Sequence, residues 1–342
     1  MFKGDIVYDL TQKKTFGDFR EGYVDFSLGK SVDVRAGRHI ITWGVGDLLF
    51  INDNFPKDYE AFFSGKPMEY MKLGSDALKL DFFPRGFSAE FVYIPFFRAN
   101  RFPSAPKFFV FDPFPAMTRE TQEPLSGFEN SQFALKLSKT IGDYDVSLYG
   151  YKGFYLFPSM QFASSSLIRL TYPRLAIYGF SAQGPGLGGI FSFEGGYYDS
   201  LNDRAGSNPT IENSSLKFLA GYQKPLTEDL NIGVQYYAES MSNYDSYLRN
   251  LPAGFPQQDQ FNQWITLRLT QFLKHQTLRL SLFGFYSPNS NDSLLIPEMK
   301  YNVNDRLEFT MGFNIFGGNK DYTLFGQLEK NDNIYMNIRY NF

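Results

Sequence analysis

The sequence predicts an all-β protein, folded as a transmembrane, antiparallel, up-and-down β-barrel of about 16 strands. Three observations predict it. Aromatic residues, nearly all Phe and Tyr, make up 18% of the chain and favour strands. Short segments alternate between apolar and polar residues from one end to the other. Tight turns alternate with long loops, so we expect residues 1–342 to form one barrel domain with long extracellular loops and short periplasmic turns.

Composition excludes several other classes of protein. The longest uninterrupted apolar runs hold four residues, as at 48–51, whereas a spanning helix needs roughly 20. There is no cysteine, so disulfides and thiolate metal sites are excluded. A net charge of -3 gives no general attraction to nucleic acid. Residues 1–10 lack the features of a signal peptide, so the chain is either cytoplasmic or the mature form of an exported protein.

The final segment, 333–342 (NIYMNIRYNF), shows the alternation most clearly. Ile334, Met336 and Ile338 fall on one face, while Asn337 and Arg339 fall on the other. The same two-residue period recurs at 22–28, 78–82, 132–139, 191–198, 216–222, 230–238, 263–272, 276–282 and 306–315.

The polar face of nearly every segment carries charge at mid-strand, while the opposite face is Leu, Phe, Ile, Val and Tyr. In a membrane barrel the apolar face meets lipid and the polar face lines a lumen, and closure leaves no strand edge unpaired. A large soluble β-protein with solvated outer faces is the alternative. We favour the barrel and therefore expect the bacterial outer membrane, with lipid and lipopolysaccharide as partners of the outer face.

The spacing of the connections supports the same fold. We expect short turns at 28–31, 83–86, 139–143, 183–188, 224–229, 272–275 and 302–305. We expect long loops at 11–17, 45–75, 96–129, 153–171, 200–213, 239–260, 287–292 and 316–332. The even strand number places both termini on the short-turn side. A barrel of this size leaves an aqueous channel.

Three segments resemble known barrels. The aromatic-rich last strand ending in Phe342 resembles the signal by which Gram-negative outer-membrane barrels are recognised for insertion. Residues 34–44 (VRAGRHIITWG) and 178–198 (YGFSAQGPGLGGIFSFEGGYY) resemble porin-like barrels related to alginate-export channels. The resemblance implies a barrel that allows passive passage. The chain departs from alginate exporters because it lacks an extended cationic lining.

Charged residues on the inferred inner face are candidates for lining the pore. Acids outnumber bases in the first strands, and bases outnumber acids in the later ones, which predicts opposed acidic and basic walls with a transverse field. Such a lumen would favour small polar solutes or ions; the alternative is pairing of acids and bases across neighbouring strands. The candidates are Arg35, Arg38, His39, Lys79, Asp81, Glu90, Lys136, Glu194, Arg268, Arg279, Glu298, Lys300 and Arg339.

Arg35, Arg38 and His39 could form an anion site. Strict alternation would point Arg38 at lipid, and a bulge near Gly37 would return it to the lumen. Ordinary salt bridges with the acidic wall are the alternative.

Residues 96–129 form the longest loop and are similar in size and order to the loop that narrows general porins. Five prolines exclude a regular strand or helix there. We expect it to constrict the pore, with an outward-folded lid or an assembly surface as the alternative. Its charged candidates are Arg98, Arg101, Lys107, Asp112 and Arg119.

The second long loop, 45–75, holds apolar stretches at 48–51 and 61–63 around acids that could loosely hold a cation or simply be solvated.

The sequence contains no complete motif for a zinc site or a nucleotide site. Two histidines cannot build a multi-histidine zinc site, and residues 184–189 (GPGLGG) precede a strand where a nucleotide site needs a helix. We expect no catalysis, no cofactor and no metal.

The function expected is a porin-like channel for passive diffusion. The alternatives are a sleeve around a periplasmic or lipoprotein partner and a surface adhesin. Whether the barrel is a monomer or a homotrimer stays open.

Overall fold

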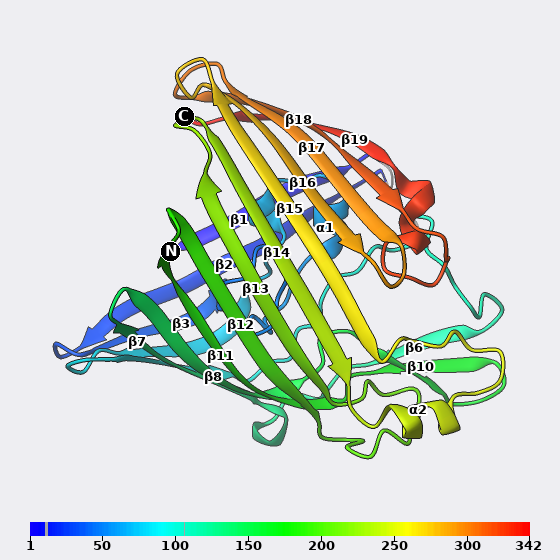
Figure 1. Cartoon of the computed structure of the whole chain (residues 1–342). Helices are drawn as coiled ribbons and strands as arrows, with labels where there is room; N and C mark the ends of the chain where they lie inside the picture. The colour runs from blue at the N-terminus through cyan, green and yellow to red at the C-terminus, as the bar shows by residue number, and fades with distance from the viewer. Residues whose placement is uncertain (11–12, 106) are drawn as a thin grey trace.

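The computed structural model describes residues 1–10, 13–105 and 107–342; Thr11, Gln12 and Pro106 lie outside the described residues. Its main element is a 16-stranded antiparallel sheet whose strands follow one another in chain order (Figure 1). The strands are β1 (Phe2–Asp9), β2 (Lys14–Leu28), β3 (Val32–His39), β4 (Ser75–Phe82), β5 (Ser88–Ile94), β7 (Gln132–Ile141), β8 (Tyr144–Phe154), β11 (Arg174–Gly186), β12 (Gly189–Ser200), β13 (Ser215–Pro225), β14 (Leu230–Met241), β15 (Phe261–Leu273), β16 (Leu278–Ser287), β17 (Asp292–Asn302), β18 (Leu307–Gly317) and β19 (Asn333–Tyr340). The predicted all-β, up-and-down barrel is confirmed.

Short turns and long loops lie at opposite ends of the sheet, and both termini lie toward the short-turn end (Figure 1). The turn between β11 and β12 has two residues, Leu187 and Gly188, with φ of 52° and 75°. Positive φ at both positions matches the twist of a tight hairpin. The predicted loop 11–17 is wrong from Lys14 onward, because β2 begins there.

A second sheet lies among the long loops and has three short strands in the order β6 (Thr118–Gln122), β10 (Leu167–Thr171) and β9 (Ser159–Phe162). The expectation that proline excludes strand from 96–129 is wrong at β6, which fits between Pro115 and Pro124 and pairs with β10. The helices are α1 (Tyr59–Phe63), η1 (Met68–Tyr70), η2 (Phe128–Asn130), α2 (Tyr244–Asn250) and η3 (Gly326–Asn331). No helix in the described chain has the length and apolar content to cross a bilayer.

The two faces of the main sheet differ as the alternation predicts. On β19, Met336 and Ile338 are 61% and 74% exposed on the outer face. Their neighbours Tyr335, Asn337 and Arg339 point inward, where they line a cavity. Apolar side chains exposed around a whole sheet fit a surface that meets lipid.

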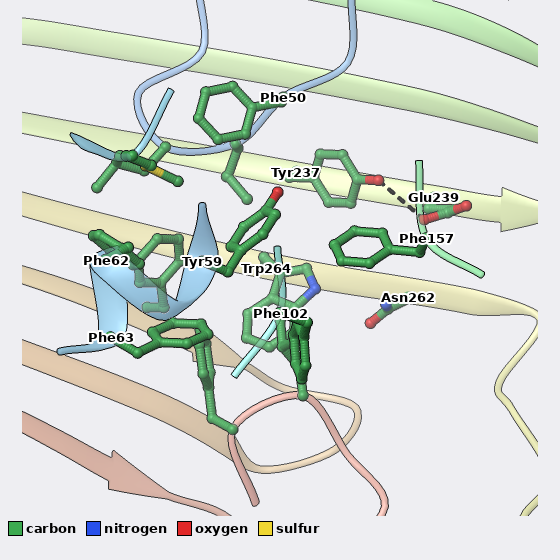
Figure 2. Close-up of a pocket in the computed structure, with 16 residues that line it drawn as sticks. Phe50, Tyr59, Phe62, Phe63, Phe102, Phe157, Tyr237, Glu239, Asn262 and Trp264 are labelled. Atoms are coloured by element: carbon green, nitrogen blue, oxygen red, sulfur yellow. Dashed lines mark hydrogen bonds between the residues drawn. The ribbon is translucent and has the colours of Figure 1, made fainter. Parts of the chain in front are cut away.

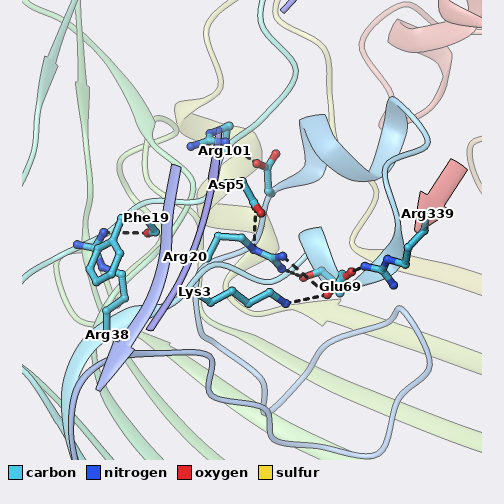
Figure 3. Close-up of polar contacts among 9 residues, drawn as sticks. Lys3, Asp5, Phe19, Arg20, Arg38, Glu69, Arg101 and Arg339 are labelled. Atoms are coloured by element: carbon cyan, nitrogen blue, oxygen red, sulfur yellow. Dashed lines mark hydrogen bonds and ion pairs between the residues drawn. The ribbon is translucent and has the colours of Figure 1, made fainter. Parts of the chain in front are cut away.

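The two end strands of the sheet are joined through side chains. Across the described residues, no backbone ladder connects β1 to β19. Instead, the Glu69 carboxylate accepts hydrogen bonds from Lys3 of β1, at 2.8 Å, and from Arg339 of β19 (Figure 3). Arg20 of β2 lies 3.7 Å from the same carboxylate. One acid of η1 therefore links both edges of the sheet.

We predict that charge on the outer face destabilises the barrel. Leu267 is an exposed outer residue at the middle of β15, and Leu267→Arg should lower the free energy of unfolding in lipid vesicles by roughly 2–4 kcal/mol. The matched control is Thr270→Arg on the same strand, because Thr270 lines a cavity in the lumen. Equal losses from both variants would contradict the assignment of the two faces.

Candidate functional site

The chain between β3 and β4 folds into the barrel. We call residues 40–74 the infolded segment. Ile51, Phe55 and Phe63 within it are at most 2% exposed and belong to one apolar cluster with side chains of the barrel wall. The apolar stretches 48–51 and 61–63 explain this path, because they would otherwise stay exposed in a loop.

Glu194 on β12 anchors the infolded segment. Its side chain is buried, and its carboxylate accepts backbone hydrogen bonds from Val45 (2.9 Å), Gly46 (3.1 Å) and Asn52 (2.7 Å). The Asn52 side-chain amide donates a fourth bond at 3.0 Å. Four donors compensate the cost of burying this charge.

Glycine permits this close contact. Gly44 has φ of 79°, and a Cβ there would lie 2.6 Å from the Glu194 carboxylate. A Cβ at Gly179 of β11 would overlap the Asn52 side chain, at 1.8 Å from its Oδ1. The two segments that resemble porin-like barrels, 34–44 and 178–198, thus meet at this contact.

Further contacts hold the infolded segment to other strands. Arg268 of β15 pairs with Asp47 at 2.8 Å, and the Trp43 indole donates to Glu90 of β5 at 2.6 Å. The Tyr198 hydroxyl donates to the Ile51 carbonyl oxygen at 2.5 Å. The Asn314 side chain of β18 donates to the Phe63 carbonyl oxygen at 2.9 Å. The segment therefore reaches strands on several sides of the barrel.

The acids of the infolded segment pair with bases. Asp53 contacts Lys57 at 3.3 Å and Lys72 at 2.6 Å, and Asp58 contacts Arg101 at 2.6 Å. Burial lowers the pKa of Lys57, and the Asp53 carboxylate opposes this effect. These contacts fit neither the loose cation site nor the solvated loop considered from the sequence.

Three cavities follow one another beside the infolded segment. The outer cavity, 360 Å³, lies at the loop ends of β13–β17 and shares Glu239, Asn262, Trp264 and Leu324 with the next. The aromatic cavity, 220 Å³, lies between Tyr59, Phe102, Tyr237 and Trp264 (Figure 2). The inner cavity, 570 Å³, shares Leu48 and Phe62 with the aromatic one and extends toward the short turns. The three cavities share lining residues in sequence, and the aromatic cavity has the smallest volume of the three.

Five of the predicted pore-lining residues line the inner cavity: Arg268, Arg279, Glu298, Lys300 and Arg339. Each base among them has an acidic partner. Arg279 donates to Glu298 at 2.8 Å, Lys300 pairs with Glu308, and the partners of Arg268 and Arg339 are Asp47 and Glu69 of the infolded segment.

The remaining predicted pore-lining residues lie on earlier strands. Lys79 contacts Asp81 at 2.8 Å and Glu90 at 3.8 Å. Lys136 lies over the Tyr149 ring at 5.9 Å. The Lys79 contacts agree with the alternative in which acids and bases neutralise each other within and between neighbouring strands.

Arg35, Arg38 and His39 have separate partners. Arg35 forms two hydrogen bonds with Asp25, at 2.7 and 3.0 Å. Arg38 forms two with Asp76, the residue opposite it on β4, at 2.9 and 2.6 Å. His39 is buried, and its Nδ1 lies 2.9 Å from the Gly37 carbonyl oxygen. The register between β2 and β3 and between β3 and β4 runs through Gly37 without a shift. The predicted bulge near Gly37 is therefore wrong.

Three candidates from 96–129 contact the infolded segment. Arg98 donates to the Gly74 carbonyl oxygen at 2.6 Å, Arg101 pairs with Asp58, and Lys107 contacts Glu60 at 2.9 Å. Asp112 and Arg119 pair with each other farther along the loop.

Several residues that build the site were not among the residues predicted from the sequence. Asp47, Asn52 and Glu69 hold the infolded segment, while Tyr237 and Trp264 line the aromatic cavity. The signal for the first group was the apolar stretches within 45–75, which are unusual in a solvated loop. The cavity residues carried no such signal, because aromatic side chains also occur throughout the outer face.

Comparison with solved structures shows similarity to OccAB3 of Acinetobacter baumannii, with a TM-score of 0.51, 11% identity, and coverage of 95% of this chain and 77% of that one. A mutant of the Rhodopseudomonas blastica porin gives a TM-score of 0.43 at 11% identity, covering 94% of this chain and 88% of that one. No family model and no curated protein matches the sequence. At these identities the similarity concerns the fold, and the predicted porin-like β-barrel is confirmed.

We predict that Glu194→Ala releases the infolded segment. Removing the carboxylate leaves four donors unpaired, at about 1–3 kcal/mol for each one that stays buried. The chain has no cysteine, so Ile51→Cys provides a single label site that maleimide should not reach in the native barrel. Its labelling should accelerate at least tenfold with Glu194→Ala and also with Gly44→Ala. Glu298→Ala, an acid removed elsewhere in the lumen, is the control and should leave labelling unchanged.

We predict that acid loosens the infolded segment at Glu60. Burial raises the pKa of Glu60, but hydrogen bonds from Lys107 and Ser104 outweigh it and hold the pKa below its ordinary value of 4.5. A carboxyl group with a lowered folded-state pKa stabilises the fold above its unfolded pKa, and this contribution is lost as pH falls through the folded pKa. Labelling of Ile51→Cys, with a reagent active in acid, should rise below about pH 4.5. Glu60→Gln should reduce this dependence; an unchanged pH profile would contradict the role of Glu60.

Proposed function

We propose that the protein is an outer-membrane channel for passive diffusion, narrowed by the infolded segment. The observation that carries the proposal is the series of three cavities with shared walls, which runs from the loop ends of the strands toward the short turns inside an apolar-faced barrel. A porin-like fold supports it. No step of this function needs catalysis or a cofactor.

The solutes we propose are small, polar or ionic, with weak charge selectivity. In the inner cavity the bases Arg268, Arg279, Lys300 and Arg339 each pair with an acid. Pairing weakens the transverse field that opposed acidic and basic walls would create. The inner cavity then offers many hydrogen-bonding groups and little net charge to a passing solute.

Location and assembly belong to the same proposal. The exposed apolar outer face suits outer-membrane lipid and lipopolysaccharide, and a homotrimer is an assembly compatible with such a barrel. A sleeve around a protein partner would need a free lumen, and the infolded segment occupies it. An adhesin would use the loop side, where α2 and the three-stranded sheet lie.

The test is single-channel conductance of the refolded protein in a planar bilayer. We expect discrete, persistent openings with weak ion preference. Arg279 and Glu298 pair with each other in the inner cavity and give a matched pair of variants. Arg279→Gln should shift the reversal potential in a salt gradient toward cation preference, and Glu298→Gln toward anion preference. An inserted barrel that carries no current would contradict the channel.

A further inference from the structure

The aromatic cavity has the composition of a binding site for a specific class of solute. Ten of its sixteen lining residues are aromatic, including Tyr59, Phe102, Phe157, Tyr237 and Trp264. Figure 2 shows these rings arranged around one space, with the Glu239 carboxylate at its edge. An apolar or aromatic group would gain contact area against such walls.

Charge at the mouth of the aromatic cavity favours a cation. Glu239 is the one carboxylate among the described residues that line it, and its side chain keeps 28% exposure. The Tyr237 hydroxyl donates to Glu239 at 3.0 Å, and Lys217 lies 3.3 Å from its other oxygen. The rings beside Glu239 also present π faces, which attract an organic cation.

The outer cavity adds to this preference. Its lining holds four acids, Glu212, Glu239, Asp259 and Asp292, against two bases, Lys217 and Lys320. An excess of acids in a partly enclosed space raises the local concentration of cations. Lys217 also lies over the Tyr198 ring, at 3.9 Å, and neither of these residues lines the aromatic cavity.

We propose that the aromatic cavity binds organic cations that combine an aromatic or apolar body with an ammonium group. The body fills the space between Tyr59, Phe102 and Trp264, and the ammonium lies at the mouth beside Glu239. This inference deepens the proposed function and rests on it, since the aromatic cavity has the smallest volume of the three cavities along the proposed route. Amphipathic amines would then cross the barrel through a site that holds them briefly.

The test uses the fluorescence of Trp264, in protein reconstituted into lipid nanodiscs. Trp264 lines the cavity, whereas the other tryptophan, Trp43, is buried against Phe55 and Tyr149. The probes are 2-phenylethylammonium, the neutral 2-phenylethanol of the same shape, and ethylammonium, which lacks the ring. We expect a saturable change with 2-phenylethylammonium and at least tenfold weaker binding of the other two. Trp264→Phe should abolish the change.

Two variants separate binding at Glu239 from a general effect on packing. Glu239→Gln should weaken 2-phenylethylammonium binding at least fivefold, because it removes the carboxylate and leaves Lys217 without this partner. Lys217→Gln removes the competing base and should tighten binding. A structural effect alone would weaken binding in both variants. Equal binding of the amine and the alcohol, or tighter binding with Glu239→Gln, would overturn the proposal.

Failure of the channel and failure of the site are distinguishable. Fluorescence reports occupancy without conduction, so a barrel that binds the amine and passes no current would contradict the proposed channel only. A barrel that conducts but shows neither a fluorescence change nor block of the current by 2-phenylethylammonium would overturn the site and leave the channel standing.

Discussion

The Glu194 carboxylate fixes the interior of this barrel. It is buried, it accepts four hydrogen bonds from the infolded segment, and Gly44 provides the space for the approach. A buried charge needs such partners, and backbone N–H groups inside a barrel need acceptors. The Glu194 carboxylate accepts hydrogen bonds from the backbone N–H groups of the infolded segment, so both groups are paired and β12 holds the segment in place. The arrangement decides how much of the lumen remains open.

The remaining space follows from where the infolded segment is tied. Its contacts with Arg268 of β15, Asn314 of β18 and the cations around Glu69 leave room beside β13–β19, where the three cavities lie. The charged inner cavity and the aromatic cavity therefore have different walls because they lie beside different parts of the infolded segment and the sheet. The first lies between polar strand residues near the short turns, and the second lies against the apolar stretches of the segment.

The sequence predicted the barrel well because alternation and turn spacing are local properties of each strand. The same alternation predicted that Glu194, Arg279 and Arg339 point into the barrel, where they contact other inward side chains; that they line a pore stays a prediction. It could not show that Glu194 meets Gly44, since that contact joins residues 150 positions apart and depends on the whole barrel. Nor could it show which partner Arg38 takes, because Asp76 becomes its neighbour only through the register of β3 and β4.

The conductance of a barrel without the infolded segment would show whether this segment narrows the lumen. His39 and Ser75 are paired across β3 and β4, so a two-residue Asn-Gly turn can replace residues 40–74 and close the hairpin. We expect this barrel to insert and to conduct several-fold more current than the intact chain, with little remaining ion preference. Equal conductance of the two inserted barrels would contradict the claim that the infolded segment sets the width of the pore.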